Sequence, residues 1–354
     1  MPTLELSYAQ QRAQTQQLFI RETLRTLPDS CGAFIRAIEP QTTPLTRSAY
    51  VRDLRLFLHF LTNEVPRFGS IDPVLFSDAD FNAITVDHIA LFNEYLTLYA
   101  RQDDRTETNQ ELSKMRKLST LRSYFAYMFK TARIDRNVAL LIDLPKIREK
   151  PILRLEIDEM ARLLDIAETG DALSERQQKW HERTKARDLA ILSLFLGTGI
   201  RVSELVGIDI QDVDMELGGF LVTRKGGDQV VLYFPDEVAR VLEAYLRERN
   251  EIEALAGHQQ ALFLSMQRRR ITVRAVENLV KKYAILAAPL KKKISPHKLR
   301  STFGTNLYHE TGDIYLVADV LGHSDVNTTK KHYAAMTDDR RRAAARVVKL
   351  REED

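Results

Sequence analysis

HKLR at residues 297–300, LGH at 321–323 and TTKKHY at 328–333 are three short motifs close together near the C-terminal end of this 354-residue chain. A fourth motif, GTGIRVSEL at 197–205, lies well upstream. Together they contain two arginines, three histidines and a tyrosine, and Arg201, Arg300, His297, His323 and Tyr333 are the chemically relevant set. Such side chains can attack a phosphodiester and stabilise the charge that develops on it without a metal ion. We therefore interpret the four motifs as parts of one candidate catalytic site.

The composition is that of an ordinary globular protein, and the length allows two domains. Cys31 is the only cysteine, which excludes an internal disulfide and a cysteine-rich zinc site. The first residues lack the basic start and apolar run of a signal peptide, and the longest apolar stretch, 189–200, is too short to span a bilayer. We therefore expect a soluble cytoplasmic protein, associated with the nucleoid if it acts on DNA.

Charge is distributed unevenly along the chain, although the net charge is only +3. Basic residues strongly outnumber acidic ones in 114–150 and again in 266–300, whereas 72–111 is acidic. Separated basic regions suggest two surfaces that face one polyanion, because phosphate contacts supply most non-specific affinity for nucleic acid. The alternative is that both regions are solvated helix faces. The candidate catalytic motifs lie between these regions, at 197–205, and at the end of the second one, at 297–300. Their position favours double-stranded DNA as the partner.

Helical periodicity dominates the sequence, which predicts a mainly α fold with a small antiparallel β-sheet. Residues 1–45 are polar and are interpreted as an N-terminal extension of unassigned role. Helices expected near 50–61, 86–99 and 113–131 place a helical domain at 46–143, and the third of them has one apolar and one basic face. Residues 144–151 contain two prolines and four charges, which is typical of a linker.

The second domain is predicted to occupy 152–354. Its apolar helix near 186–196 ends at a Gly-Thr-Gly sequence, which is a helix stop. The clearest β signal is a pair of short runs, 220–223 and 229–234, joined by a hairpin-like turn. A polar insertion separates the first two helices of this domain, at 169–185.

Arg201 and Arg300 are the candidate phosphate-binding residues. Two guanidiniums can hold the non-bridging oxygens of a pentavalent phosphorus in a forked geometry, and they stay charged at any working pH. For Arg201 taken alone, a surface ion pair with nearby Glu204 is the better explanation, and the C-terminal motifs shift the balance toward phosphate binding. His297 lies three residues before Arg300, on the same face of an expected helix, where an imidazole could relay protons.

Tyr333 is the candidate nucleophile. Its phenol has a pKa near about 10 in isolation, so it needs a cationic neighbourhood or proton removal to attack at useful rates. His323 is placed to hydrogen-bond the phosphate, with a helix-capping or core role as the alternative. Lys225, in the hairpin turn, is the candidate general acid for the departing 5′ oxygen, although a solvated turn lysine would look the same locally.

Taken together, Arg201, Lys225, His297, Arg300, His323 and Tyr333 follow the order of the catalytic residues in the tyrosine site-specific recombinase family. The catalytic half, about 150–345, resembles that family closely, and the helical half resembles its core-binding (SAM-like) domain more loosely. Within the family the chain is similar to Xer-type recombinases, particularly the single-recombinase XerS-like branch. One feature departs from the pattern: the family usually places its tyrosine one residue closer to the Gly-His histidine, and His332 occupies that slot here.

The resemblance implies an enzyme that cuts and rejoins duplex DNA through a 3′-phosphotyrosyl intermediate, with no cofactor, metal or ATP. It also implies a clamp around DNA and a homotetramer on two sites, linked by exchange of a C-terminal helix. An apolar strip beyond residue 342 offers such a helix, although the strip could instead pack on its own domain. Phosphate contacts are expected from basic residues of both domains: Arg47, Arg52, Arg116, Lys117, Arg122, Arg268, Arg269 and Arg270.

Several other readings stay open at this point. A type IB topoisomerase relative would share the chemistry, and a non-catalytic DNA-binding protein could keep a degenerate site. A metal-dependent nuclease is disfavoured because no carboxylate cluster or metal-ligand spacing is present. Chromosome-dimer resolution and integration or excision of a mobile element would use the same residues, so the sequence does not separate those two roles.

Overall fold

The computed structural model of the chain describes residues 7–100, 106–145, 153–224, 227–291, 293–323 and 326. Two compact units divide the chain at residues 150 and 151, and each has its own buried apolar residues. The architecture is mainly helical with small antiparallel sheets, which confirms the predicted fold class. Within those described ranges, no helix is both long enough and apolar enough to cross a membrane.

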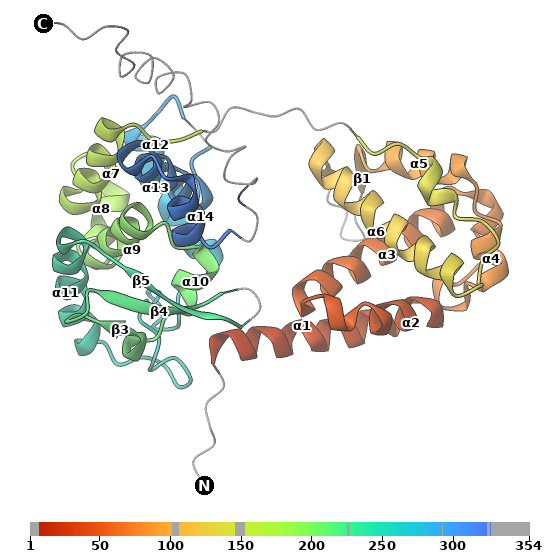
Figure 1. Cartoon of the computed structure of the whole chain (residues 1–354), viewed down its shortest axis with the longest axis horizontal. Helices are drawn as coiled ribbons and strands as arrows, with labels where there is room; N and C mark the ends of the chain where they lie inside the picture. The colour runs from red at the N-terminus through yellow and green to blue at the C-terminus, as the bar shows by residue number, and fades with distance from the viewer. Residues whose placement is uncertain are drawn as a thin grey trace, which may run out of the picture. The chain divides into compact units, whose positions relative to one another are not determined.

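The first unit is an assembly of helices with one short hairpin (Figure 1). Its longer elements are α1 (Tyr8–Leu24), α2 (Asp29–Ala37), α3 (Pro44–Glu64), α4 (Asp78–Asn82), α5 (Val86–Tyr95), β1 (Leu98–Ala100), β2 (Thr106–Thr108) and α6 (Glu111–Lys130). Four 3-10 turns connect them, at Glu39–Gln41, Pro66–Phe68, Pro73–Leu75 and Val138–Leu141.

Aromatic side chains make up much of the core of this unit. Phe57 of α3 packs edge-on against Phe92 of α5, with ring centroids 5.0 Å apart, and against Phe125 of α6 at 6.3 Å. The three helices expected from periodicity are these three elements. Thr85 caps α5 as predicted, since its hydroxyl accepts a hydrogen bond from the His88 backbone N–H at 3.4 Å. The helix ends before residue 99 because the chain enters β1, a strand that the sequence did not reveal.

Helices α1 and α2 require a correction to the predicted domain boundary. Their side chains Ile20, Cys31 and Phe34 are at most 1% exposed and belong to the same core as α3 to α6. Phe34 lies 5.4 Å from the ring of Tyr124 on α6. Much of 1–45 is therefore part of the helical unit rather than an extension of it. Most of α1 is polar, with only two buried residues, which is why its packing role was missed.

The second unit is an α/β assembly in which a three-stranded antiparallel sheet lies at one edge of a group of helices (Figure 1). Its elements are α7 (Ile157–Thr169), α8 (Glu175–His181), α9 (Lys185–Thr198), α10 (Val202–Gly207), β3 (Val213–Asp214), β4 (Gly219–Thr223), β5 (Gln229–Tyr233), α11 (Asp236–Glu251), α12 (Val273–Ala287), α13 (Pro296–Thr311) and α14 (Ile314–Leu321), with a 3-10 turn at Ile210–Asp212.

The predicted hairpin is present as β4 and β5. Thr223 pairs with Gln229, and Phe220 with Leu232, in antiparallel register. The turn is closed by the backbone N–H of Arg224, which donates to the carbonyl of Asp228 at 2.8 Å. Short runs of β-branched and aromatic residues on both sides of a glycine-containing turn explain why this pair could be predicted from sequence.

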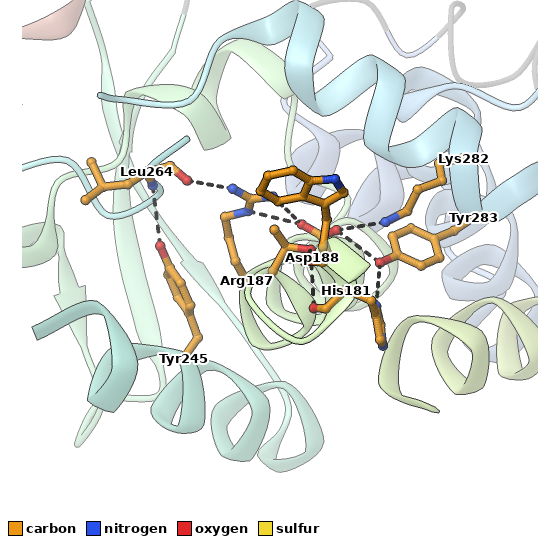
Figure 2. A network of polar contacts seen from close by, with 9 residues as sticks. His181, Arg187, Asp188, Tyr245, Leu264, Lys282 and Tyr283 are labelled. Carbon is orange, nitrogen blue, oxygen red and sulfur yellow. Dashed lines mark hydrogen bonds and ion pairs between the residues drawn. The ribbon is translucent and has the colours of Figure 1, made fainter. Parts of the chain in front are cut away.

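A buried polar network anchors α9, the central helix of the second unit (Figure 2). The carboxylate of Asp188 accepts hydrogen bonds from the Arg187 guanidinium at 2.7 Å and from the Tyr283 hydroxyl at 3.0 Å, and Lys282 Nζ lies 3.3 Å away. His181 Nδ1 lies 3.4 Å from the same hydroxyl. Burial raises the pKa of Tyr283 and lowers that of Lys282. The network joins α8, which forms inside the predicted polar insertion, to α9 and α12.

Replacing Asp188 by alanine is expected to lower the free energy of unfolding of the second unit by about 3 kcal/mol, because two partly buried cations, Arg187 and Lys282, would lose a buried counter-ion. The Asp188 side chain is only 3% exposed. Urea unfolding followed by fluorescence measures the loss, since the single tryptophan, Trp180, lies in α8 beside the network. The control is Asp158→Ala, whose partner Arg162 is 55% exposed, and which should cost no more than about 1 kcal/mol. Equal losses in the two variants would contradict a structural role for the network.

Candidate active site

Arg201 is presented at a sharp break between two helices. Helix α9 ends at Gly199, whose φ of +63° is in the left-handed region that favours glycine. A β-carbon there would also overlap the ring of Phe303 on α13. The chain then continues through Ile200, fully buried, to Arg201, which immediately precedes α10. The Gly-Thr-Gly stop predicted from sequence is therefore required both by backbone conformation and by packing.

The Arg201 guanidinium has two partners. Its Nη1 donates to Glu204 Oε1 at 2.7 Å, so the ion pair considered as an alternative does form. Its Nη2 donates to the carbonyl of Gly322 at 2.7 Å, far away in sequence. The Glu204 side chain is 6% exposed and that of Arg201 34%. The buried carboxylate thus fixes the orientation of a guanidinium that is still partly open to solvent.

Arg300 lies close to Arg201. It is on α13 and only 6% exposed. Its Nη1 donates to the carbonyl of Gly199 at 2.5 Å, and its Nη2 donates to the carbonyl of Leu321. Leu321 and Gly322 are consecutive, so the guanidiniums of the two predicted phosphate-binding residues converge on adjacent peptide groups at the C-terminal end of α14.

The two predicted histidines belong to the same region. His323 directly follows the left-handed Gly322, and its backbone N–H donates to the carbonyl of Ala318 at 2.9 Å, which closes the helix end. His297 lies in the first turn of α13, one turn before Arg300, and is exposed. The guanidiniums of Arg201 and Arg300 and the backbone of His323 therefore meet at the C-terminal end of α14, and the role of the His323 side chain stays a prediction.

Lys225 and Tyr333 lie outside the described residues, as do residues 146–151 of the predicted linker and the whole of 338–354. The catalytic roles of Lys225 and Tyr333, and the exchange helix, thus stay predictions from the sequence.

Arg224 was not predicted, yet it completes a cluster of three guanidiniums around the end of α14. Its Nη2 donates to the carbonyl of Val320 at 2.9 Å, and its Nη1 to that of Asp319 at 3.3 Å. Positive side chains are favourable here because the carbonyls of the last helical turn lack partners within the helix. The only sequence signal was an arginine beside the candidate lysine in the hairpin turn.

Three of the predicted DNA contacts must be corrected, because their side chains are committed to the fold. Arg47 is 5% exposed, pairs with Glu39 at 3.0 Å and donates to a nearby carbonyl. Arg122 donates to the carbonyls of Ala139 and Ile142. Arg270, 12% exposed, binds Asp209 and two backbone carbonyls. We no longer propose these three as phosphate contacts.

The other predicted contacts are at least partly open. Arg116 is 48% exposed but forms a forked ion pair with the buried Asp53, at 2.5 and 2.7 Å. Lys117 is half-buried and donates to Asn109, and burial lowers its pKa. Arg52 is exposed and lies over the Phe19 ring at 4.5 Å. The last two members of the set, Arg268 and Arg269, are exposed at the tip of a turn.

Comparison with known proteins identifies the relatives of this chain. Residues 154–340 match the pattern described as the phage integrase family. The tyrosine recombinase XerC of Caldanaerobacter subterraneus subsp. tengcongensis is 33% identical over 81% of this chain and 77% of its own length. The tyrosine recombinase XerC of Pelobacter propionicus is 30% identical over 83% of this chain and 86% of its own length.

Two solved structures have a similar fold. The XerH site-specific recombinase bound to palindromic difH substrate gives a TM-score of 0.60 at 20% identity, covering 86% of this chain and 80% of that one. The Tn1549 transposon integrase in complex with a circular intermediate DNA also gives 0.60 at 20% identity, covering 90% and 99%.

Fold and arginine cluster together define the class, a tyrosine recombinase of the Xer-like type. The chain belongs to the phage integrase family. Both of these sequence relatives carry the name XerC, so the XerS-like branch stays a prediction.

Proposed function

We propose that this recombinase cuts and rejoins duplex DNA at specific sites through a 3′-phosphotyrosyl intermediate, in the manner of Xer-like chromosome dimer resolution. The observation that carries the proposal is the convergence of Arg201 and Arg300 on the adjacent carbonyls of Leu321 and Gly322. Two fixed guanidiniums form a cradle for the doubly charged oxygens of a phosphorane, and the buried Glu204 and Gly199 contacts pre-organise them before any substrate arrives.

The proposed reaction needs no external energy source. Tyr333 gives its phenol proton to His297, the proposed proton relay, as its oxygen attacks phosphorus. The bond from phosphorus to the 5′ oxygen breaks, and the tyrosine becomes linked to the 3′ phosphate. The departing 5′ oxygen takes a proton from Lys225, while His323 and His297 assist hydrogen bonding and proton transfer near the phosphate. The 5′ hydroxyl freed in the partner duplex then attacks the phosphotyrosyl phosphorus. This step is the reverse of the first one; it rejoins the DNA and releases the tyrosine. Phosphodiester bonds are conserved in number throughout.

DNA backbone contacts are proposed for the basic side chains that remain exposed. Arg268 and Arg269 extend from the tip of the turn between two bridged residues, Leu264 and Arg270, where no acidic side chain pairs with them among the described residues. Arg52 of α3 and the outer edges of Arg116 and Lys117 on α6 offer a second basic face. Such contacts would fix register on the duplex without reading sequence.

We further propose that the two units close around the duplex as a clamp, and that four copies act on two DNA sites. Exchange of the segment 338–354 between neighbouring copies would link them. Acting on chromosomal DNA would place the protein in the cytoplasm at the nucleoid. Two observations support a role on DNA. The sequence relatives are XerC recombinases, and the XerH recombinase and the Tn1549 integrase, which share the fold, were solved bound to DNA.

Covalent protein–DNA adducts trapped in the source cells, followed by sequencing of the attached DNA, test the proposal. Adducts at one chromosomal site are expected if the chain resolves chromosome dimers. Adducts at the two ends of a mobile element would replace that role with integration or excision. DNA binding without any adduct would overturn the proposed enzymatic function and favour a DNA-binding protein with a silent site.

A further inference from the structure

Arg224 connects the end of the β4–β5 hairpin to the end of α14, two segments almost a hundred positions apart in sequence. Its two terminal nitrogens donate to the carbonyls of Asp319 and Val320. Those carbonyls are followed directly by the ones that accept from Arg300 and Arg201, at Leu321 and Gly322. Four successive peptide groups are thus held by three guanidiniums.

The contact is shaped closely around Arg224. Gly322 has a φ of +60°, and a β-carbon built there would overlap the Arg224 guanidinium. Glycine at 322 therefore serves both the left-handed helix cap and the close approach of the arginine. The Nε of Arg224 is buried and has no hydrogen-bond partner among the residues that the structure describes. Burying a donor without a partner is unfavourable. The hydrogen bonds from the two terminal nitrogens and the close packing on Gly322 must therefore outweigh the cost of burying Nε.

We propose that Arg224 is a positioning residue for Arg201 and Arg300. It fixes the last turn of α14, and that turn is the surface against which both phosphate-binding guanidiniums are aligned. Arg224 itself does not touch the phosphate in this scheme. The inference rests on the proposed function, because Arg201 and Arg300 need to be aligned only if they bind the phosphate that the enzyme cleaves.

An arginine that only stabilised the fold would be expected to contact several parts of the second unit. The guanidinium makes no ion pair among those found in the described ranges, and it binds only backbone carbonyls at the end of one helix. Loss of these contacts would leave the rest of β4 and β5 paired, because their ladder does not depend on the Arg224 side chain. The effect of removing Arg224 should therefore concentrate on the turn 319–323 and on the arginines bound to it.

The first readout does not require DNA. Amide hydrogen exchange is compared in the full-length protein, in Arg224→Ala, in Arg224→Lys and in the control Arg247→Ala, an exposed arginine of α11. The amides of Gly322 and His323 donate to the carbonyls of Asp319 and Ala318. We expect them to exchange about tenfold faster in Arg224→Ala, with an intermediate effect in Arg224→Lys and none in the control. Unchanged exchange in Arg224→Ala would overturn the proposal whatever the enzyme does.

The second readout is the single-turnover rate of adduct formation on a nicked duplex that carries the sequence recovered by adduct mapping. Arg224→Ala should be slower by about 10- to 100-fold, since small misplacements of positioned groups have effects of this size. The same duplex with a methylphosphonate at the cleaved position has lost the negative charge that the two arginines neutralise. On that substrate the ratio of wild-type to variant rate should shrink to about threefold or less.

A 5′-bridging phosphorothiolate provides the opposite comparison, because a thiolate leaves without being protonated. The defect of Arg224→Ala should persist on this substrate. A defect that vanished there and persisted on the methylphosphonate would assign Arg224 to the leaving group instead, and would overturn the inference. If the wild-type protein formed no adduct, the proposed function would fail. If the wild-type protein and Arg224→Ala formed adducts at equal rates, only the role of Arg224 would be refuted.

Discussion

Replacing Tyr333 by phenylalanine is expected to abolish covalent protein–DNA adducts while leaving DNA affinity within about twofold of the wild type. The change removes one oxygen, the proposed nucleophile, and no charge, so phosphate contacts that dominate affinity are kept. Gel separation of denatured protein–DNA mixtures measures the adduct, and a mobility shift measures binding on the same duplex. The loss should be complete, because no other step can form the phosphotyrosyl bond.

The matched controls are Tyr233→Phe and His332→Ala. Tyr233 is 64% exposed on β5 and should tolerate the loss of its hydroxyl without effect. His332 occupies the position where the family usually has its tyrosine, so its replacement tests whether the longer spacing after His323 has moved the nucleophile. Adducts that persisted in Tyr333→Phe and disappeared in His332→Ala would refute the assignment of the nucleophile.

Features set by local patterns were predictable from the sequence. The hairpin was predicted from two short runs rich in β-forming residues on either side of a glycine-containing turn, and β4 and β5 form there. The exposure of Arg201 between two helices followed from the Gly-Thr-Gly stop, because a left-handed residue ends a helix at Gly199. The H-x-x-R spacing likewise placed His297 and Arg300 on one helix, α13.

Features set by long-range contacts were not predictable. Arg122 and Arg270 lie in the two basic regions, and Arg47 lies on the first predicted helix of the helical domain. All three looked like DNA contacts because they are basic, yet they bind backbone carbonyls whose positions depend on the folded chain. The same reason hid Arg224. An arginine that donates to backbone carbonyls at a turn or helix end has no recognisable sequence pattern. Every residue carries a backbone carbonyl, so the sequence does not show which one will accept the hydrogen bond.

Charge counts along the sequence also overstated the basic face of α6. Arg116 is paired with Asp53, which lies on α3 and is 3% exposed, and Thr120 donates to the same carboxylate at 2.8 Å. Lys114 is buried and donates to Thr97 at 2.7 Å. An acidic partner from another helix neutralises part of the stripe, so the face that α6 can offer to DNA is smaller than the sequence indicated. Charge runs therefore predict a nucleic-acid surface only after their intramolecular partners are known.

Replacing Arg201 by lysine is expected to slow adduct formation by about 10²- to 10³-fold, the range seen when one pre-organised donor to a reacting oxyanion is removed. Lysine keeps the charge but cannot bind Glu204 and Gly322 together while also presenting a planar fork to the phosphate. Because the side chain is 34% exposed, the free energy of unfolding should change little. The single-turnover rate on a nicked duplex measures the effect, with Arg247→Lys on α11 as the control.

Arg300→Lys should differ from Arg201→Lys in one respect that follows from burial. Arg300 is 6% exposed and joins the end of α9 at Gly199 to the end of α14 at Leu321. Its replacement should slow adduct formation by a similar factor and also lower the free energy of unfolding by about 1–3 kcal/mol, because buried carbonyls lose their donor. Urea unfolding of both variants separates the two effects. Wild-type adduct rates in either variant would remove the arginine pair from the mechanism, and equal stability of both would show that the Gly199 and Leu321 contacts contribute little to the fold.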